Sequence, residues 1–110
     1  MASYFGYVRS YALNLKAPGG LGLLGYHGVI NLELDFSSEG IGSAYCYFVP
    51  DGGVLGENQK RPDSLHFDVY FWMSSWMRFV DLLHTAPSVS FNFTEDGRAE
   101  LQSGVRGFGE

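Results

Sequence analysis

The sequence predicts an α+β domain that is mainly β: about six mostly antiparallel strands form a curved or barrel-like sheet, with one helix between the fourth and fifth strands. Aromatic residues make up 16% of the chain beside 15 Gly, a composition that suits pleated strands better than helices. Most segments alternate apolar and polar residues with period two, and a single segment has helical spacing. The 110 residues form a single domain, residues 1–110, because chains below roughly 200 residues have little room for two cores.

Three strands are predicted in the N-terminal half. The first covers residues 7–16, and one of its faces is apolar or aromatic with a single exception. That face carries Tyr7, Tyr11, Leu13 and Leu15, with Arg9 as the exception. Residues 29–36 show the clearest alternation, because the even positions are all apolar and most odd positions are polar. Residues 44–49 are apolar or aromatic on both faces, which indicates a central strand.

The C-terminal half begins with a loop and a fourth strand. Residues 54–64 are polar and predict the longest loop of the chain. Residues 65–73 then alternate with period two, which predicts a strand with two different faces. One face carries Phe67, Val69, Phe71 and Met73, and the other carries His66, Asp68, Tyr70 and Trp72.

A helix is predicted next, with Ser74 or Ser75 as its N-cap. Its apolar residues recur at helical spacing and form a stripe that faces the sheet. The stripe consists of Trp76, Phe79, Val80 and Leu83. Pro87 ends the helix. Two further strands, residues 88–93 and 98–103, are joined by a hairpin turn with the sequence Glu-Asp-Gly.

Composition and charge exclude several classes of function. The net charge is −5 at pH 7 and neither half of the chain carries a stripe of Lys and Arg, which disfavours nucleic acid as a partner, including a single strand bound on an aromatic sheet. The single cysteine excludes an internal disulfide and a Cys-cluster zinc site. The N-terminus lacks the pattern of a secretion signal, and no stretch is long and apolar enough to span a bilayer. We therefore expect a cytoplasmic protein with no membrane partner.

Three chemical motifs each have a structural explanation. Residues 20–25 match the pattern GxGxxG, but a dinucleotide site needs a helix to open at the end of the motif, and here a strand follows. His27, His66 and His84 do not have the spacing of metal ligands. Cys46 lies within an apolar strand, where a free cysteine usually acts as a small buried hydrophobe. We expect no cofactor, no metal site and no catalytic residues.

The strongest candidate site is the second face of the sheet, opposite the face that builds the core. The candidate residues are Glu33, Asp35, Tyr45, Tyr47, His66, Asp68, Tyr70 and Trp72, with the neighbours of Tyr45 and Tyr47 as the other possibility on their strand. Such a face can be a subunit interface, where Tyr and Trp are enriched. It can also be a ligand cleft, with apolar walls and a few polar groups, in which the carboxylates would have raised pKa values. The third possibility is an ordinary solvated face.

The interface is favoured over the cleft because of the size of the domain. A small domain buries only about two thirds of the surface of its chain, and 9 Phe, 7 Tyr and 2 Trp are hard to hide in it. We expect a small, non-enzymatic binding or assembly domain that forms a homodimer through this aromatic surface. The alternative is a small-molecule-binding or catalytic cup that uses the same carboxylates and His66.

Three segments resemble a set of small uncharacterised bacterial proteins. Residues 44–52 (AYCYFVPDG) are similar to a "yFvpDG" strand end, and residues 79–87 (FVDLLHTAP) to a "vvdLLr-ekPv" junction between a helix and a strand. Residues 107–110 (GFGE) are similar to a "PvGEgE" tail, although Arg106 departs from that pattern. The resemblance implies a bacterial origin and one domain of conserved size, and it implies no activity.

Overall fold

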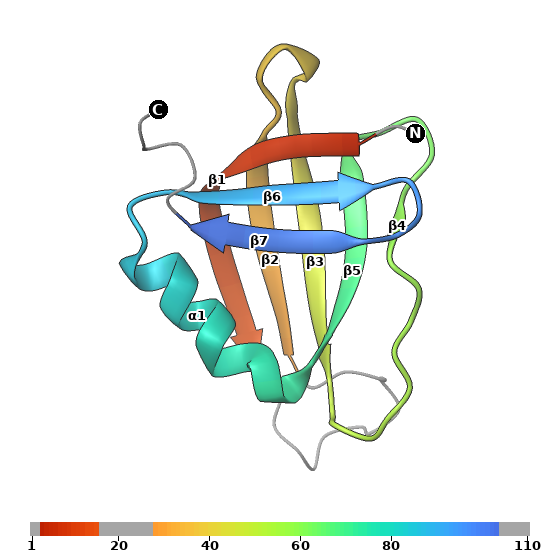
Figure 1. Cartoon of the computed structure of the whole chain (residues 1–110), viewed down its shortest axis with the longest axis vertical. Coiled ribbons are helices and arrows are strands. Elements are labelled where there is room, and N and C mark those ends of the chain that lie inside the picture. Colours follow the sequence, from red (N-terminus) through yellow and green to blue (C-terminus); the bar gives the residue numbers. More distant parts are fainter. Residues whose placement is uncertain (1–2, 16–27, 104–110) are drawn as a thin grey trace.

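The computed structural model describes residues 3–15 and 28–103. These residues form a mainly β domain in which one curled, seven-stranded sheet packs against one α-helix (Figure 1). The strands are β1 (Ser3–Leu15), β2 (Gly28–Asp35), β3 (Ile41–Val49), β4 (Gln59–Lys60), β5 (His66–Trp72), β6 (Val89–Thr94) and β7 (Ala99–Ser103). The helix α1 spans Trp76–Thr85, and short 3-10 turns lie at Ser37–Glu39 and Met73–Ser75. The predicted fold class is confirmed.

The strand count differs from the prediction, because the described residues contain seven strands rather than six. The additional strand is β4, in which Gln59 and Lys60 pair with Asp68 and Phe67 of β5. It lies inside the segment predicted as the longest loop, and two residues in a polar stretch leave no period-two pattern. As a result α1 follows the fifth strand and precedes the sixth, whereas the prediction placed it between the fourth and the fifth.

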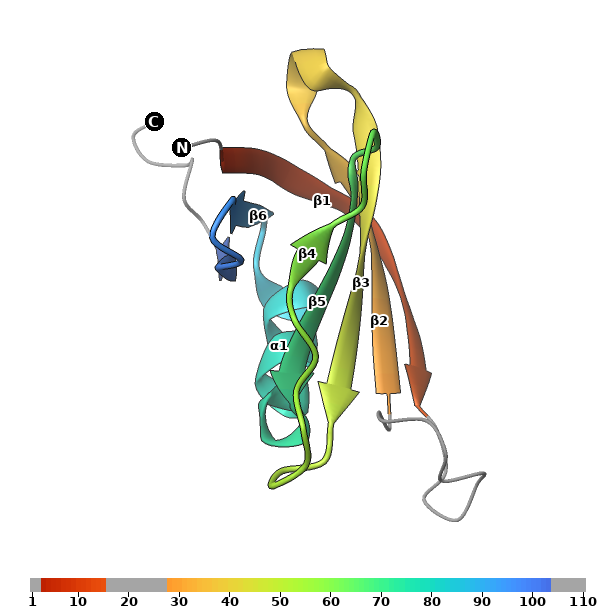
Figure 2. The same ribbon diagram turned by 90° about the vertical axis from the view of Figure 1, so that its right-hand side faces the viewer.

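The strands are ordered β4-β5-β3-β2-β1-β6-β7 across the sheet. All neighbouring pairs are antiparallel except β3 and β5, which are parallel. The parallel pair requires a connection that returns from one end of the sheet to the other, and the segment containing β4 makes this return along the edge of β5 (Figure 2).

A β-bulge in β1 makes the sheet curl over itself. The first half of β1 pairs with β6 and the second half with β2, and the register shifts between Val8 and Ser10. The extra residue there is Arg9, which explains why a charge interrupts the predicted apolar face. Tyr7 pairs with Asp35 but Tyr11 pairs with Leu32, so these two tyrosines lie on opposite faces. The prediction that they share a face is wrong, because one inserted residue reverses the alternation.

The hydrophobic core lies between the inner face of β2, β3 and β5 and the layer formed by α1, β6 and β7 (Figures 1 and 2). Its fully buried side chains are Ile30, Leu32, Leu34, Ala44, Cys46, Phe48, Phe67, Val69 and Phe91. The helix contributes Phe79 and Leu83, with Trp76 and Val80 partly buried beside them. The predicted helical stripe is confirmed. Ser75 is the N-cap as predicted, although its side chain makes no capping hydrogen bond.

Close packing of the helix onto the sheet depends on Phe48, Trp76 and Gly28. The ring of Phe48 lies edge-on to Trp76 and to Phe79, with centroid distances of 4.9 and 5.1 Å. A Cβ atom at Gly28 would lie 2.7 Å from Cζ3 of Trp76. The indole therefore packs directly on the backbone of β2, in space that a side chain would fill.

Some sequence features lie outside the described residues. They are the glycine motif at residues 20–25, His27, the last residue of the predicted first strand and the tail at residues 107–110. Within the described ranges, no helix has the length and apolar character that crossing a bilayer demands.

Candidate functional site on the outer sheet face

The outer face is the side of β2, β3 and β5 that points away from α1, on the right of the sheet in Figure 2. The register places side chains of neighbouring strands in rows on this face, with Tyr45 beside Asp68 and Tyr47 beside Tyr70. Cys46 lies between the two tyrosines and points into the core. Tyr45 and Tyr47, rather than their neighbours, therefore occupy the candidate face. We call Tyr45, Tyr47 and Tyr70 the tyrosine cluster.

The carboxylate of Asp68 lies at the centre of the face and is held by an arginine. Nε and Nη2 of Arg61 donate hydrogen bonds of 2.8 and 2.9 Å to its two oxygens, and the hydroxyl of Tyr47 donates a third of 3.1 Å. Asp68 is only 6% exposed. The hydrogen bonds from Arg61 are the main reason why the pKa of Asp68 lies below its ordinary value. Raised carboxylate pKa values were expected for this face in the case of a ligand cleft; the pKa of Asp68 is lowered instead, because a cation is bound to it.

The tyrosine rings pack on one another and on this ion pair. Tyr47 and Tyr70 are stacked with 5.0 Å between centroids, and Tyr45 lies edge-on to Tyr47 at 6.4 Å. The guanidinium of Arg61 lies 5.3 Å from the centre of the Tyr45 ring, which is the geometry of a cation–π contact. Burial, together with the charge of Asp68, raises the pKa of Tyr47 to about 12. Tyr47 thus remains a hydrogen-bond donor at neutral pH.

His66 lies at one side of the tyrosine cluster. A hydrogen bond joins its Nδ1 to Oγ of Ser43, and its ring lies edge-on to Tyr45 with 5.0 Å between centroids. A serine beside a histidine is the start of a nucleophilic site, but such a site needs a third group to orient the histidine. Among the described residues Ser43 is the only hydrogen-bond partner of the His66 ring, and Asp68 is engaged by Arg61 instead. The pair lacks the arrangement of a catalytic triad.

Of the other three predicted residues, Glu33 borders this group opposite Ser43 in the register, and Asp35 and Trp72 lie apart from it. Glu33 is exposed and accepts a hydrogen bond of 3.1 Å from Oγ of Ser10. Asp35 accepts a hydrogen bond of 2.8 Å from the backbone N–H of Ser37, so it stabilises the turn after β2. Trp72 is 36% exposed at the far end of β5. The structure therefore brings together five of the eight predicted residues, Tyr45, Tyr47, His66, Asp68 and Tyr70, with Glu33 at the border of the group.

Two residues at the centre of the face were not predicted. Ser43 precedes Tyr45 by two positions, so the alternation of β3 was sufficient to find it. Arg61 belongs to the polar loop, seven residues before Asp68. No periodic pattern connects a loop residue to a strand position, and only the return of the chain along β5 brings the two together.

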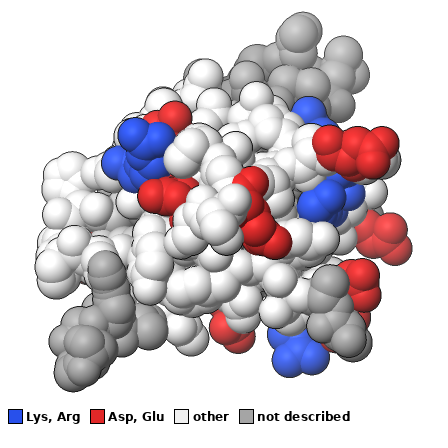
Figure 3. Space-filling view, turned by 90° about the horizontal axis from the view of Figure 1, so that it is seen from above, with Lys and Arg blue, Asp and Glu red and all other residues white. Residues whose placement is uncertain are grey.

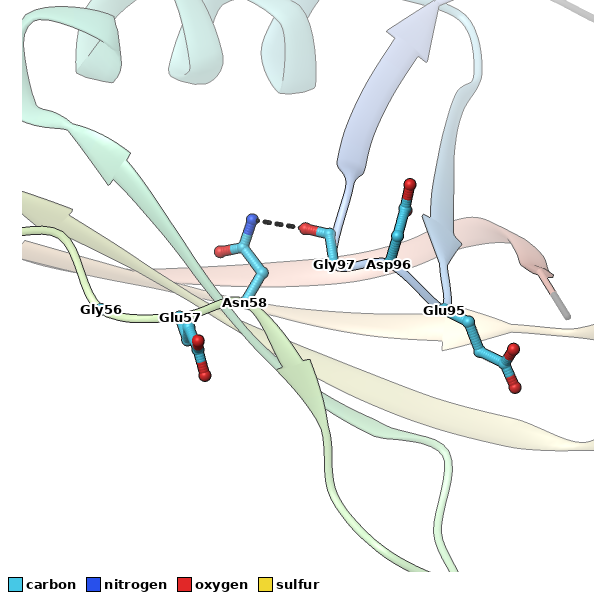
Figure 4. A pocket seen from close by; sticks show the side chains of 6 residues that line it. All are labelled: Gly56, Glu57, Asn58, Glu95, Asp96 and Gly97. Atoms are coloured by element: carbon cyan, nitrogen blue, oxygen red, sulfur yellow. Dashed lines mark hydrogen bonds between the residues drawn. The ribbon is translucent and has the colours of Figure 1, made fainter. Parts of the chain in front are cut away.

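Asn58 joins the edge of this face to the far end of the sheet. Its Oδ1 accepts a hydrogen bond of 2.7 Å from the N–H of Tyr70. Its Nδ2 donates a hydrogen bond of 3.0 Å to the carbonyl of Gly97, as Figure 4 shows. The side chain thus replaces a strand partner at the edge of β5 and holds the β6–β7 turn beside it. A depression of about 460 Å³ at this point is lined by Glu57, Glu95 and Asp96.

The charges on the face of the molecule seen from above are mixed rather than grouped by sign. In the view from above, Lys and Arg side chains alternate with Asp and Glu side chains over the surface (Figure 3). No group of three metal-ligating side chains occurs among the residues that the structure describes. The chain matches no protein-family model, no curated protein and no solved structure. The resemblance to small bacterial proteins stays a prediction.

Proposed function

We propose that this chain is a small, non-enzymatic binding or assembly domain that forms a homodimer through its outer sheet face. The observation that supports this most is the tyrosine cluster around the Arg61–Asp68 pair, on a face that no described strand or helix covers. Tyrosine and arginine are the residue types that are enriched in protein interfaces. Both combine large contact area with groups that water satisfies when the partner is absent.

The Arg61–Asp68 pair on the face carries no net charge, which favours a second copy as the partner. The whole chain carries a net charge of −5, so two copies repel each other over most of their surface. At the centre of the outer face the charge of Asp68 is matched by that of Arg61 at 2.8 Å. In a two-fold arrangement the same patch meets itself, so a neutral ion pair avoids the repulsion between like charges.

The dimensions of the face suit an interface of ordinary size. The three strands of the outer face and the adjoining half of β1, each ~4.8 Å wide, and eight residues of ~3.3 Å span roughly 19 by 26 Å. The surface of such a patch is of the same order as the ~800 Å² that each partner contributes to a standard interface. The outer face therefore supplies a large part of the area that each partner buries in a standard interface.

Light scattering coupled to size exclusion tests the dimer at tens of micromolar. Asn31 is exposed and lies beside Tyr45 in the register, so Asn31→Arg puts a long cation into the centre of the face without removing a contact. We expect a dimer for the wild type and a monomer for Asn31→Arg. The control is Met77→Arg, because Met77 is 73% exposed on the helix; it stays dimeric. A wild-type chain that is strictly monomeric contradicts the proposal.

The alternative is a small-molecule cup, and one observation favours it. A shallow depression of about 330 Å³ lies beside the tyrosine cluster, lined by Glu33, Ser43 and Tyr45 among others. This volume is at the lower limit of ligand pockets. A thermal-shift screen with a metabolite panel tests the cup. Compounds that stabilise the wild type and the Glu39→Gln control, but not Glu33→Gln, would establish the cup. A panel in which no compound stabilises the wild type contradicts the cup.

A further inference from the structure

A second candidate site lies on the other side of the sheet, where β7 faces α1. Among the described strands, β7 is the last of the sheet and pairs only with β6. A depression lies between this strand and the helix, lined by Phe71, Ser75, Arg78, Phe79, Leu82 and Leu101. In Figure 1, β6 and β7 run across β2, β3 and β5, and β7 is the outer strand of the two, with α1 beside it. We call this place the β7–α1 groove.

The free edge of β7 presents backbone hydrogen-bonding groups to the groove. The N–H of Thr94 donates to the carbonyl of Arg98 at 2.9 Å, so these two residues form a hydrogen-bonded pair of the β6–β7 ladder. Such pairs alternate with pairs whose N–H and C=O groups point away from the partner strand. By this alternation the backbone groups of Ala99 and Leu101 point outward, and no hydrogen bond outside the ladder reaches them among the described residues.

The size of the groove selects one side chain rather than a small-molecule ligand. Its volume is about 170 Å³, below the ~300–1,000 Å³ of typical ligand pockets. An apolar cavity of ~150 Å³ is large enough for benzene, which corresponds to one aromatic or branched aliphatic side chain. Phe71, Phe79, Leu82 and Leu101 provide apolar walls for such a side chain.

The remaining lining residues favour a carboxylate next to that side chain. Arg78 is exposed in the first turn of α1 and has no ion-pair partner among the described residues. Ser75 also lines the groove, and its hydroxyl is not used as a helix cap. A guanidinium binds a carboxylate in a bidentate way. On an extended segment, side chains two positions apart lie on the same side, so the acidic residue is expected two positions from the apolar one.

We propose that the β7–α1 groove binds an extended segment of a partner protein as an additional strand on β7. The segment inserts one aromatic or branched side chain between Phe79 and Leu101, and a carboxylate two residues away binds Arg78. This combination of strand addition and a side-chain pocket is a common mode of peptide recognition. It is independent of the dimer, because the groove and the outer face lie on opposite sides of the sheet.

Selection of random octapeptides displayed on phage, with the full-length chain as target, tests the proposal. We expect enriched peptides to share one aromatic or branched residue with Asp or Glu two positions away. Binding of a labelled enriched peptide is then measured by fluorescence anisotropy. Arg78→Gln weakens binding about tenfold, as loss of one charge-assisted contact does, whereas the control Arg9→Gln, at another exposed arginine, has no effect. Asn31→Arg also leaves peptide binding unchanged, which separates this test from that of the dimer.

A scan of N-methylated versions of the same peptide tests strand addition directly and needs no variant of the protein. In an added strand only alternate N–H groups point toward β7, so methylation at every second residue abolishes binding and at the others does not. The proposal is overturned if no peptide is enriched, if the scan shows no alternation, or if Arg78→Gln binds as well as the wild type. A shift of oligomeric state by Arg78→Gln without any enriched peptide assigns the groove to a second copy and also overturns it.

Discussion

The Arg61→Gln substitution removes the cation that is hydrogen-bonded to the nearly buried carboxylate of Asp68. Two charge-assisted hydrogen bonds of 2.8 and 2.9 Å are lost. Removing one partner of a fully buried ion pair costs about 3–5 kcal/mol. The side chain of Arg61 is 44% exposed, so water screens part of the interaction, and the hydroxyl of Tyr47 still donates to Asp68. We therefore expect the free energy of unfolding to fall by about 2 kcal/mol.

Urea denaturation followed by intrinsic fluorescence measures this loss, and Arg98→Gln is the matched control. Arg98 contacts Asp96 at 3.3 Å, with side chains that are 72% and 44% exposed. Such surface pairs contribute about 0.5 kcal/mol or less. If Arg61→Gln costs no more than Arg98→Gln, the Arg61–Asp68 pair does not hold the outer face together, and the reasoning is refuted.

The pH dependence gives a second test of the same pair. The pKa of Asp68 lies below its ordinary value of 3.8 in the folded chain, chiefly because of Arg61. The ion pair therefore contributes its full stability above pH 3.8, and this contribution is lost as the pH falls through the lowered pKa. The stability difference between wild type and Arg61→Gln should be constant from neutral pH down to about pH 5 and shrink only in stronger acid. A difference that shrinks already near neutral pH contradicts this assignment.

Three further predictions concern single groups. Gly28→Ala places a Cβ 2.7 Å from Trp76, so urea denaturation should show a loss of about 1–3 kcal/mol; an unchanged midpoint would mean that the indole moves at no cost. Burial of Cys46 in the core raises the pKa of its thiol, so a thiol reagent should react only in denaturant, and rapid labelling of the native chain would contradict the packing. The pKa of Tyr47 is raised to about 12, so in an ultraviolet titration one tyrosine should ionise after the others. Tyr47→Phe should remove that late step. The stability linked to this phenol is present below its unfolded pKa and is lost as the pH rises toward 12.

Alternation was sufficient to predict the strands that build the core. In β2 and β5 every second residue is apolar, and Ile30, Leu32, Phe67 and Val69 all lie in the core. The pattern failed at Arg9, where one extra residue reverses the faces of β1. The position of a bulge depends on how two strands pair in the folded sheet. In the sequence of one strand the only sign of it is a break in the apolar–polar alternation, such as a charge on an apolar face.

The candidate site was predictable in its strand residues and not in its loop residue. Tyr45, Tyr47 and Asp68 share a face because of their positions in β3 and β5, and the parallel register places Tyr45 beside Asp68. Arg61 reaches Asp68 only because β4 pairs with β5, and β4 consists of two residues. Contacts of this kind depend on the path of a loop, for which local propensity gives no information.

The two faces of the sheet differ in their choice of aromatic residue, and this bears on what covers the outer face. Every described phenylalanine except Phe5 belongs to the core cluster or packs against it. The outer face instead carries Tyr45, Tyr47 and Tyr70, whose rings are partly exposed. A phenylalanine there would leave apolar surface in water at all times, whereas a phenol bonds water when the face is free and still buries a ring when it is covered. This choice of residue supports the proposed dimer, in which the face alternates between solvent and a partner.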